Sequence, residues 1–172
     1  MQKKPQISTK IIVTVGVLTA LSVLFRLFLG YPQTGNTRYD LGFLPIAAVG
    51  QMFGALWGGV SYVLADLVGT FFTGQSPYPP ITLCKFLFGA IFGLYFYGRR
   101  LSLSRILFCV LTISVVVDLI AMPFALSPLM GVGAYAILVQ RLVQVAVMFP
   151  VRTVSIWLMD RYIGRYYMEK YK

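Results

Sequence analysis

Apolar runs long enough to cross a lipid bilayer dominate this chain. A helix needs about 20 apolar residues to span the hydrocarbon core. The 172 residues are 58% hydrophobic and only 12% charged, whereas soluble domains average about a quarter charged. The polar segments between the runs are too short for a separate soluble domain. The sequence therefore predicts one all-α integral membrane domain over residues 1–172, with six transmembrane helices at about 10–29, 41–56, 58–73, 80–98, 104–126 and 134–162.

The stretch Leu41–Phe72 is apolar over almost its whole length but too long for a single span. Small residues interrupt it, and we expect a tight glycine turn near Leu56–Gly59 that divides it into two short helices. Polar residues and turn formers predict loops at 30–40 and 73–80. A third short loop is expected at 127–133.

Lysine and arginine are concentrated on one side of the predicted bundle. Cytoplasmic loops of membrane proteins carry an excess of these residues. With a cytoplasmic N-terminus, ten of them fall on the cytoplasmic side and only Arg38 falls on the other. This bias requires an even number of spans and predicts that both termini are cytoplasmic. The net charge of +10 therefore indicates a membrane topology and not a nucleic-acid partner. The ten are Lys3, Lys4, Lys10, Arg99, Arg100, Arg105, Arg161, Arg165, Lys170 and Lys172.

Six charged residues lie inside predicted spans. A charge at the bilayer centre costs about 2.5–3.5 kcal/mol on insertion scales, so such residues usually face a partner or a cavity. With a rise of about 1.5 Å per residue, five of the six fall in the outer half of the membrane. These five are Arg26, Asp66, Lys85, Asp118 and Arg141, and Arg152 is the sixth.

Two interpretations of these charges remain open. In the first, Asp66 and Asp118 pair with Lys85 and Arg141 to hold the helices together, and Arg26 reaches outward to the interface. In the second, the charges line an outward-facing, net-positive pocket for an anionic small molecule. The two are compatible, because an ion pair can also hold a ligand-binding side chain in place.

Aromatic residues gather near the same outer rim. Phe43, Phe71, Phe72 and Tyr78 fit the aromatic belt at a membrane interface. The belt is the better interpretation for most of them, but Phe43 and Tyr78 are also candidates for the walls of a cavity that holds a flat heterocycle with a carboxylate, since ligand pockets are mostly apolar with a few placed polar groups.

Small residues recur four positions apart in three of the predicted helices. In lipid this spacing lets helix backbones approach closely. We expect most of these residues to serve packing inside the bundle, although one stripe could face another subunit. They are Gly16 and Ala20, then Gly50, Gly54 and Gly58, and finally Gly89 and Gly93.

Signatures of catalysis are missing. Histidine is absent, which removes the commonest general base and metal ligand. Cys84 and Cys109 lie in apolar runs without metal-ligand spacing, and no nucleotide-binding or nucleophile motif occurs. The sequence predicts neither an enzyme nor a metal or cofactor site. If the protein moves a solute uphill, its ATPase is on another chain, and a purely structural membrane subunit stays an alternative.

Four sequence blocks, in order, carry a family resemblance. They are TALSVLFR (19–26), LGFLPIAAVGQMFGALWGG (41–59), ADLVGTFF (65–72) and ITLCKFLFGAIFGL (81–94). Together they resemble the substrate-binding S components of energy-coupling factor vitamin transporters, and most of all the folate-specific branch.

The resemblance implies a six-helix protein of a prokaryotic plasma membrane, surrounded by lipid, that binds its vitamin near the outer face. It implies three partner chains, a transmembrane coupling subunit and two ATPases, and toppling of the subunit to deliver the vitamin inside. The family's small-residue docking motif maps onto Gly16 and Ala20. Segments 30–40 and 73–80 would gate the site.

For folate, the resemblance also implies roles for the charges. The amino and ring N–H donors of a pterin suit a carboxylate, so Asp66 is the first candidate for pterin recognition and Asp118 the second. Arg26, Lys85 or Arg141 would face the glutamate tail or the pterin oxygen, because charge-assisted hydrogen bonds to carboxylates are strong. Riboflavin or a thiamin precursor is the alternative ligand.

Overall fold

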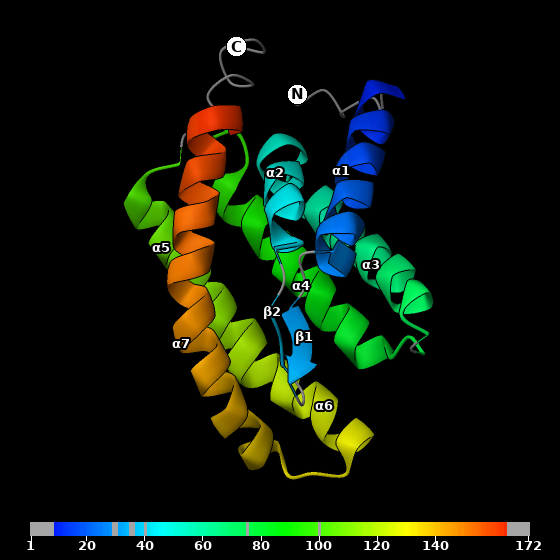
Figure 1. The fold of residues 1–172 in the computed structure, drawn as a ribbon. Helices are drawn as coiled ribbons and strands as arrows, with labels where there is room; N and C mark the ends of the chain where they lie inside the picture. The colour runs from blue at the N-terminus through cyan, green and yellow to red at the C-terminus, as the bar shows by residue number, and fades with distance from the viewer. Residues whose placement is uncertain are drawn as a thin grey trace, which may run out of the picture.

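The computed structural model describes residues 9–28, 31–34, 37–39, 41–74, 76–99 and 101–164. The regular secondary structure of these residues is helical apart from one short hairpin (Figure 1). The helices are α1 (Thr9–Phe28), α2 (Phe43–Phe53), α3 (Ala55–Phe72), α4 (Pro79–Phe96), α5 (Leu103–Thr112), α6 (Met122–Met130) and α7 (Ala134–Met159). Two π-helical segments continue them, η1 (Ile113–Ala121) between α5 and α6 and η2 (Asp160–Gly164) after α7.

Five helical stretches in the described part of the chain are long and apolar enough to cross a membrane. They are Thr9–Phe28, Ala55–Phe72, Pro79–Phe96, Leu103–Met130 and Ala134–Tyr162. The predicted second span corresponds to α2, which has 11 residues and is therefore only about 17 Å long. The chain is thus a multi-pass membrane protein, and a sixth crossing by α2 stays a prediction.

The division of the second apolar stretch lies at Gly54, not at the predicted turn near residues 56–59. Gly54 has φ of 92°, a left-handed conformation that residues with a Cβ rarely adopt. Its backbone ends α2 and starts α3. Gly58 and Gly59, which the sequence placed in the turn, lie inside α3 and pack against α4.

The predicted loops at 30–40 and 127–133 are both partly wrong. Within the first, β1 (Tyr31–Thr34) pairs antiparallel with β2 (Thr37–Tyr39), because tyrosine and threonine favour strands. Helix α6 continues through the second to Met130 and ends at Gly131, whose φ is 63°. The helix predicted at 104–126 is therefore longer than expected, and it contains η1.

Figure 1 shows α1 and α3 on one side of the bundle, α5 and α7 on the other, and α2 and α4 between them. The start of α1 and the end of α7 lie at the same end. Helix α4 packs against α3 and α2 along glycines: a Cβ on Gly58 of α3 would lie 2.5 Å from the Gly89 carbonyl oxygen, and one on Gly50 of α2 would lie 2.8 Å from the Gly93 nitrogen. These contacts bring the α2, α3 and α4 backbones together.

Candidate ligand-binding site

A cavity of about 470 Å³ opens between the helices. Its walls come mainly from the late residues of α1, α3 and α6 and the early residues of α4 and α7, which places it in the half of the bundle away from the start of α1. All seven residues that the sequence predicted as ligand contacts line this one cavity: Arg26, Phe43, Asp66, Tyr78, Lys85, Asp118 and Arg141.

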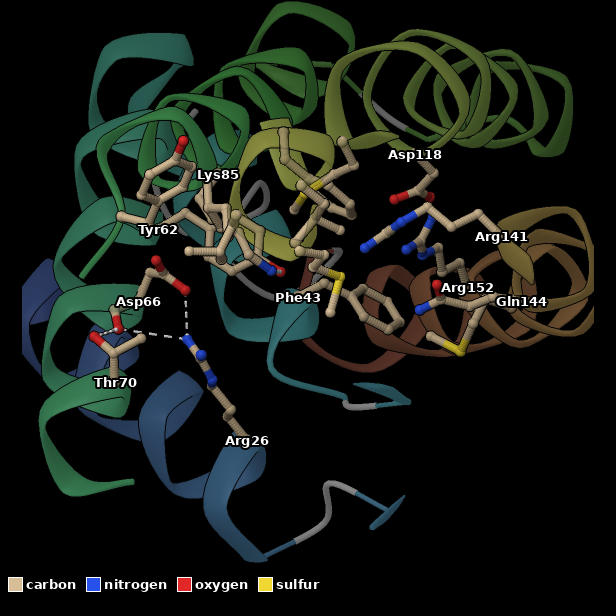
Figure 2. Close-up of a pocket in the computed structure, with 18 of the residues that line it drawn as sticks. Arg26, Phe43, Tyr62, Asp66, Thr70, Lys85, Asp118, Arg141, Gln144 and Arg152 are labelled. Atoms are coloured by element: carbon tan, nitrogen blue, oxygen red, sulfur yellow. Dashed lines mark hydrogen bonds and ion pairs between the residues drawn. The ribbon is translucent and has the colours of Figure 1, made fainter. Parts of the chain in front are cut away.

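An ion pair between α1 and α3 forms the first polar end of the cavity. Arg26 Nη1 donates a hydrogen bond to Asp66 Oδ1 at 2.6 Å, and the two side chains are 12% and 5% exposed (Figure 2). Thr70 Oγ1 donates to the Asp66 carbonyl oxygen at 2.8 Å. A Cβ on Gly69 would lie 3.1 Å from Arg26 Cδ. The glycine therefore leaves the room that lets the Arg26 side chain lie along α3.

A second polar end lies between η1 and α7. Arg152 Nη1 donates to Asp118 Oδ2 at 2.5 Å. Arg141 and Gln144 join them from the same face of α7, and Figure 2 shows Arg141, Arg152 and Asp118 gathered on one side of the cavity. The guanidinium of Arg152 also lies 4.9 Å from the Phe88 ring centroid.

Lys85 and several aromatic side chains also line the cavity. Lys85 Nζ lies 4.9 Å from the Tyr62 ring centroid and 3.5 Å from the Tyr62 hydroxyl. Phe43 is 2% exposed and faces the cavity together with Tyr78. Phe71 and Phe72 are 82% and 68% exposed and do not line the cavity, so their placement fits the interfacial-belt interpretation.

The structure shows two ion pairs that the sequence did not predict, although the residues were grouped correctly. Asp66 pairs with Arg26, and Asp118 pairs with Arg152. Arg26 therefore points into the bundle instead of reaching outward. Sequence reasoning left Arg152 out of the site. The sequence feature that could have identified Arg152 is its spacing of eleven residues from Arg141. This spacing is about three helical turns and puts both residues on one face of α7.

Among the described residues, the charges that line the cavity are four cations and two carboxylates. The cations are Arg26, Lys85, Arg141 and Arg152, and the carboxylates are Asp66 and Asp118. Among the described residues, no group of three or more His, Cys, Asp or Glu side chains could hold a metal ion. The surplus of cations in the lining suits the cavity to a ligand with negative charge.

Gly16 and Ala20, the predicted docking residues, lie on the exposed surface of α1. A Cβ on Gly16 would meet nothing within 4 Å, so internal packing does not explain this glycine. Of the two predicted gates, Ser76 and Tyr78 of segment 73–80 line the cavity. Segment 30–40 lies partly outside the described residues, and docking and gating both stay predictions.

Known proteins resemble this chain in sequence and in fold. The model of the substrate-specific component of ECF transporters matches residues 10–160. A folate transporter FolT from Clostridium novyi (strain NT) is 32% identical over 148 residues, which cover 86% of each chain. A UPF0397 protein from Enterococcus faecalis (strain ATCC 700802 / V583) is 30% identical over 104 residues, 59% of this chain and 55% of that protein.

A solved structure, a crystal structure of FolT bound with folic acid, matches the fold with a TM-score of 0.81. It is 31% identical, and the match covers 96% of both chains. The expected resemblance to S components is thereby confirmed at the level of sequence and of fold. This chain belongs to the family of substrate-specific components of energy-coupling factor (ECF) transporters.

Proposed function

We propose that this chain is the high-affinity folate-binding subunit of an ATP-driven ECF importer in a prokaryotic plasma membrane. The observation that carries the proposal is the cavity itself. It is lined by aromatic rings and holds more cations than carboxylates, in a protein similar over almost its whole length to a FolT with folic acid bound. Folate is a flat pterin joined through an aromatic linker to a glutamate with two carboxylates, so it matches this lining in shape and in charge.

Asp66 is the proposed recognition group for the pterin. One of its oxygens accepts from Arg26, and a carboxylate oxygen has more than one acceptor position. The amino and ring N–H groups of the pterin would donate to the remaining positions. Arg26 holds the carboxylate at the cavity wall, and because Arg26 balances its charge, the burial of Asp66 does not depend on the ligand.

Calorimetric titration of the purified protein with folic acid tests this function. The wild type is expected to bind saturably below micromolar concentration. Arg26→Ala and Asp66→Ala should each weaken binding about tenfold or more, because hydrogen bonds to charged groups contribute about 1.5–3 kcal/mol. Heat is a better signal of binding than tryptophan fluorescence, because neither Trp57 nor Trp157 lines the cavity.

Asp160→Ala provides the matched control, because Asp160 is a carboxylate outside the cavity that accepts a hydrogen bond from Gln51. It should retain wild-type affinity. Saturable binding of riboflavin or a thiamin precursor in place of folic acid would reassign the ligand. If none of these vitamins bound, the chain would instead be a structural subunit. If Arg26→Ala and Asp66→Ala both kept wild-type affinity, the binding site would lie elsewhere.

ATP hydrolysis and coupling are assigned to other chains in this proposal. A transmembrane coupling subunit would dock on the exposed small-residue face of α1 around Gly16 and Ala20, where backbones can approach closely. Two ATPase subunits would then drive the toppling that delivers folate inside.

The proposed orientation puts both termini in the cytoplasm and the cavity toward the outside. It is supported by the lysine and arginine bias and by the position of the α1 start and the α7 end on one side of the bundle (Figure 1). An alkaline phosphatase fused after Lys172 should be inactive in cells, and a green fluorescent protein fused there should fluoresce. The reverse pattern would refute the orientation.

A further inference from the structure

We propose that an acyl chain of a membrane lipid binds in a groove between the end of α3 and the start of α4, and that it supports the wall of the ligand cavity. The groove has a volume of about 490 Å³ and is open to one side. It shares no lining residue with the ligand cavity. Helix α3 contributes Val63 and Leu67 to its lining, and α4 contributes Pro79, Thr82, Leu83 and Phe86.

Phe86 marks the end of the groove where the two helices come together. The backbones of α3 and α4 are in contact at Gly58 and Gly89, and a Cβ on Gly59 would lie 2.7 Å from the Phe86 ring. The ring therefore lies against the α3 backbone. From Phe86 back to Pro79, α4 rises about 10 Å, less than half of the hydrocarbon core, which is about 30 Å thick. The groove thus has the length of part of one acyl chain.

The described lining of the groove is apolar. Its only polar side chain is Thr82, whose hydroxyl donates to the carbonyl oxygen of Tyr78 at 3.3 Å. Both helices are long and apolar enough to cross a membrane, and Leu67 and Leu83 are 38% and 61% exposed. The groove therefore opens toward the hydrocarbon of the bilayer. A flexible lipid chain that fills the hollow gains van der Waals contacts with its walls.

Prolines adapt the segment between the two helices to lipid. Irregular backbone is costly in hydrocarbon, because its N–H and C=O groups lack partners there. Pro77, which also lines the groove, and Pro79 have no N–H that needs a partner. The carbonyl oxygen of Tyr78 accepts from the N–H groups of Ile81 and Thr82 at 3.0 and 3.1 Å. These features reduce the number of polar groups that the segment presents to a lipid chain.

The groove and the ligand cavity lie on two faces of the same wall. On α3, Asp66 lines the cavity and Leu67 lines the groove. Before α4, Tyr78 lines the cavity and Pro79 lines the groove. A lipid chain in the groove would therefore pack against the backbone that carries cavity residues. A wall ordered by one ligand costs less to order for a second, so lipid and folate should favour each other's binding. This last step rests on the proposed folate-binding function.

Photolabelling with a lipid tests the site. The purified full chain is placed in phosphatidylcholine vesicles in which a small fraction of the lipid carries a diazirine in the middle of one acyl chain. After irradiation, peptide mass spectrometry measures the labelling of each segment. Residues 63–67 and 82–86 should be labelled about threefold or more above 107–111 of α5. The α5 segment is the reference, because Leu107, Phe108 and Leu111 are exposed on a membrane-crossing helix.

Leu67→Trp fills the groove with a side chain. It should lower the labelling of 82–86 to the level of 107–111. Leu111→Trp is the matched control, because it puts the same side chain on an exposed position of α5, and it should leave the labelling of 82–86 unchanged. If Leu67→Trp does not give monodisperse protein, the labelling pattern of the wild type decides the result.

Equal labelling of the groove and of α5 in the wild type would overturn the lipid site. Weaker labelling of the groove would also overturn it, because only a second copy of the chain could shield the groove in these vesicles.

Saturating folic acid tests the support of the cavity wall. It should raise the labelling of 82–86 about twofold, because coupling between two sites is reciprocal, and leave 107–111 unchanged. Unchanged labelling of 82–86 in protein that binds folic acid by calorimetry would overturn the supporting role. If folic acid does not bind at all, the proposed function fails, and the labelling without folic acid still decides whether the groove holds lipid.

Discussion

Alanine in place of Gly89 is expected to destabilise the subunit by about 3 kcal/mol, at the upper end of the range for overpacking a core. The new methyl group would meet the backbone of Gly58 and Gly59, and backbone atoms cannot rotate away as a side chain can. Helices α3 and α4 would have to separate along their length. The measurement is the midpoint of thermal unfolding in detergent, followed by the loss of monodisperse protein on size exclusion.

Gly16 provides the matched glycine, because a Cβ there meets nothing within 4 Å. Gly16→Ala should unfold at the wild-type temperature. Gly16→Leu should also fold and bind folic acid, yet folate uptake by cells should be lost, because the bulky side chain would keep the coupling subunit from approaching α1. Normal uptake with Gly16→Leu would remove this face from the proposed docking site, and a stable Gly89→Ala would contradict the packing argument.

The composition of the site could be predicted from the sequence because burial of charge in lipid is so costly. Each intramembrane charge therefore needed a partner or a cavity, and helical rise alone gave five of them a common depth. The structure brings Arg26, Asp66, Lys85, Asp118 and Arg141 together around one cavity. The depth of a residue in the membrane follows from its position along its helix, so it can be estimated from the sequence alone.

The pairing of these charges could not be predicted in the same way, because it depends on which helices are neighbours. Helix α1 packs beside α3, so Arg26 reaches Asp66, and Gly69 leaves the space for it. Arg152 meets Asp118 because α7 lies against η1. The position of the break before α3 was missed for a related reason: Gly54, Gly58 and Gly59 are alike in the sequence, and only packing decides which one turns the chain.

Asp118→Asn is expected to destabilise the folded subunit by about 3–5 kcal/mol, the range for removing one partner of a buried ion pair. The side chains of Arg152 and Asp118 are only 7% and 9% exposed. Without the carboxylate, Arg141 and Arg152 would be buried together without a counter-charge at this end of the cavity. Thermal unfolding in detergent, without ligand, measures the loss.

Arg152→Gln should cost less than Asp118→Asn, although it breaks the same ion pair. Arg141 interacts electrostatically with Asp118 and remains as a counter-charge when Arg152 is removed. The double replacement Asp118→Leu with Arg152→Met should be less destabilising than Asp118→Asn alone, because buried pairs are often replaced by apolar residues at little cost. Equal losses in the two single variants would mean that Arg141 does not share the carboxylate.

Folic acid should restore part of the stability that Asp118→Asn loses. A ligand that binds only the folded state stabilises it in proportion to its affinity. If the glutamate tail lies against Arg141 and Arg152, its carboxylates would supply the counter-charge that Asp118 no longer provides. The rise in unfolding temperature with saturating folic acid should therefore be larger for Asp118→Asn than for the wild type. A diamide of folic acid, in which both glutamate carboxylates are amides, should not produce the excess. A smaller rise with folic acid would mean that the ligand needs Asp118 itself, as expected if this carboxylate takes part in recognition of the pterin.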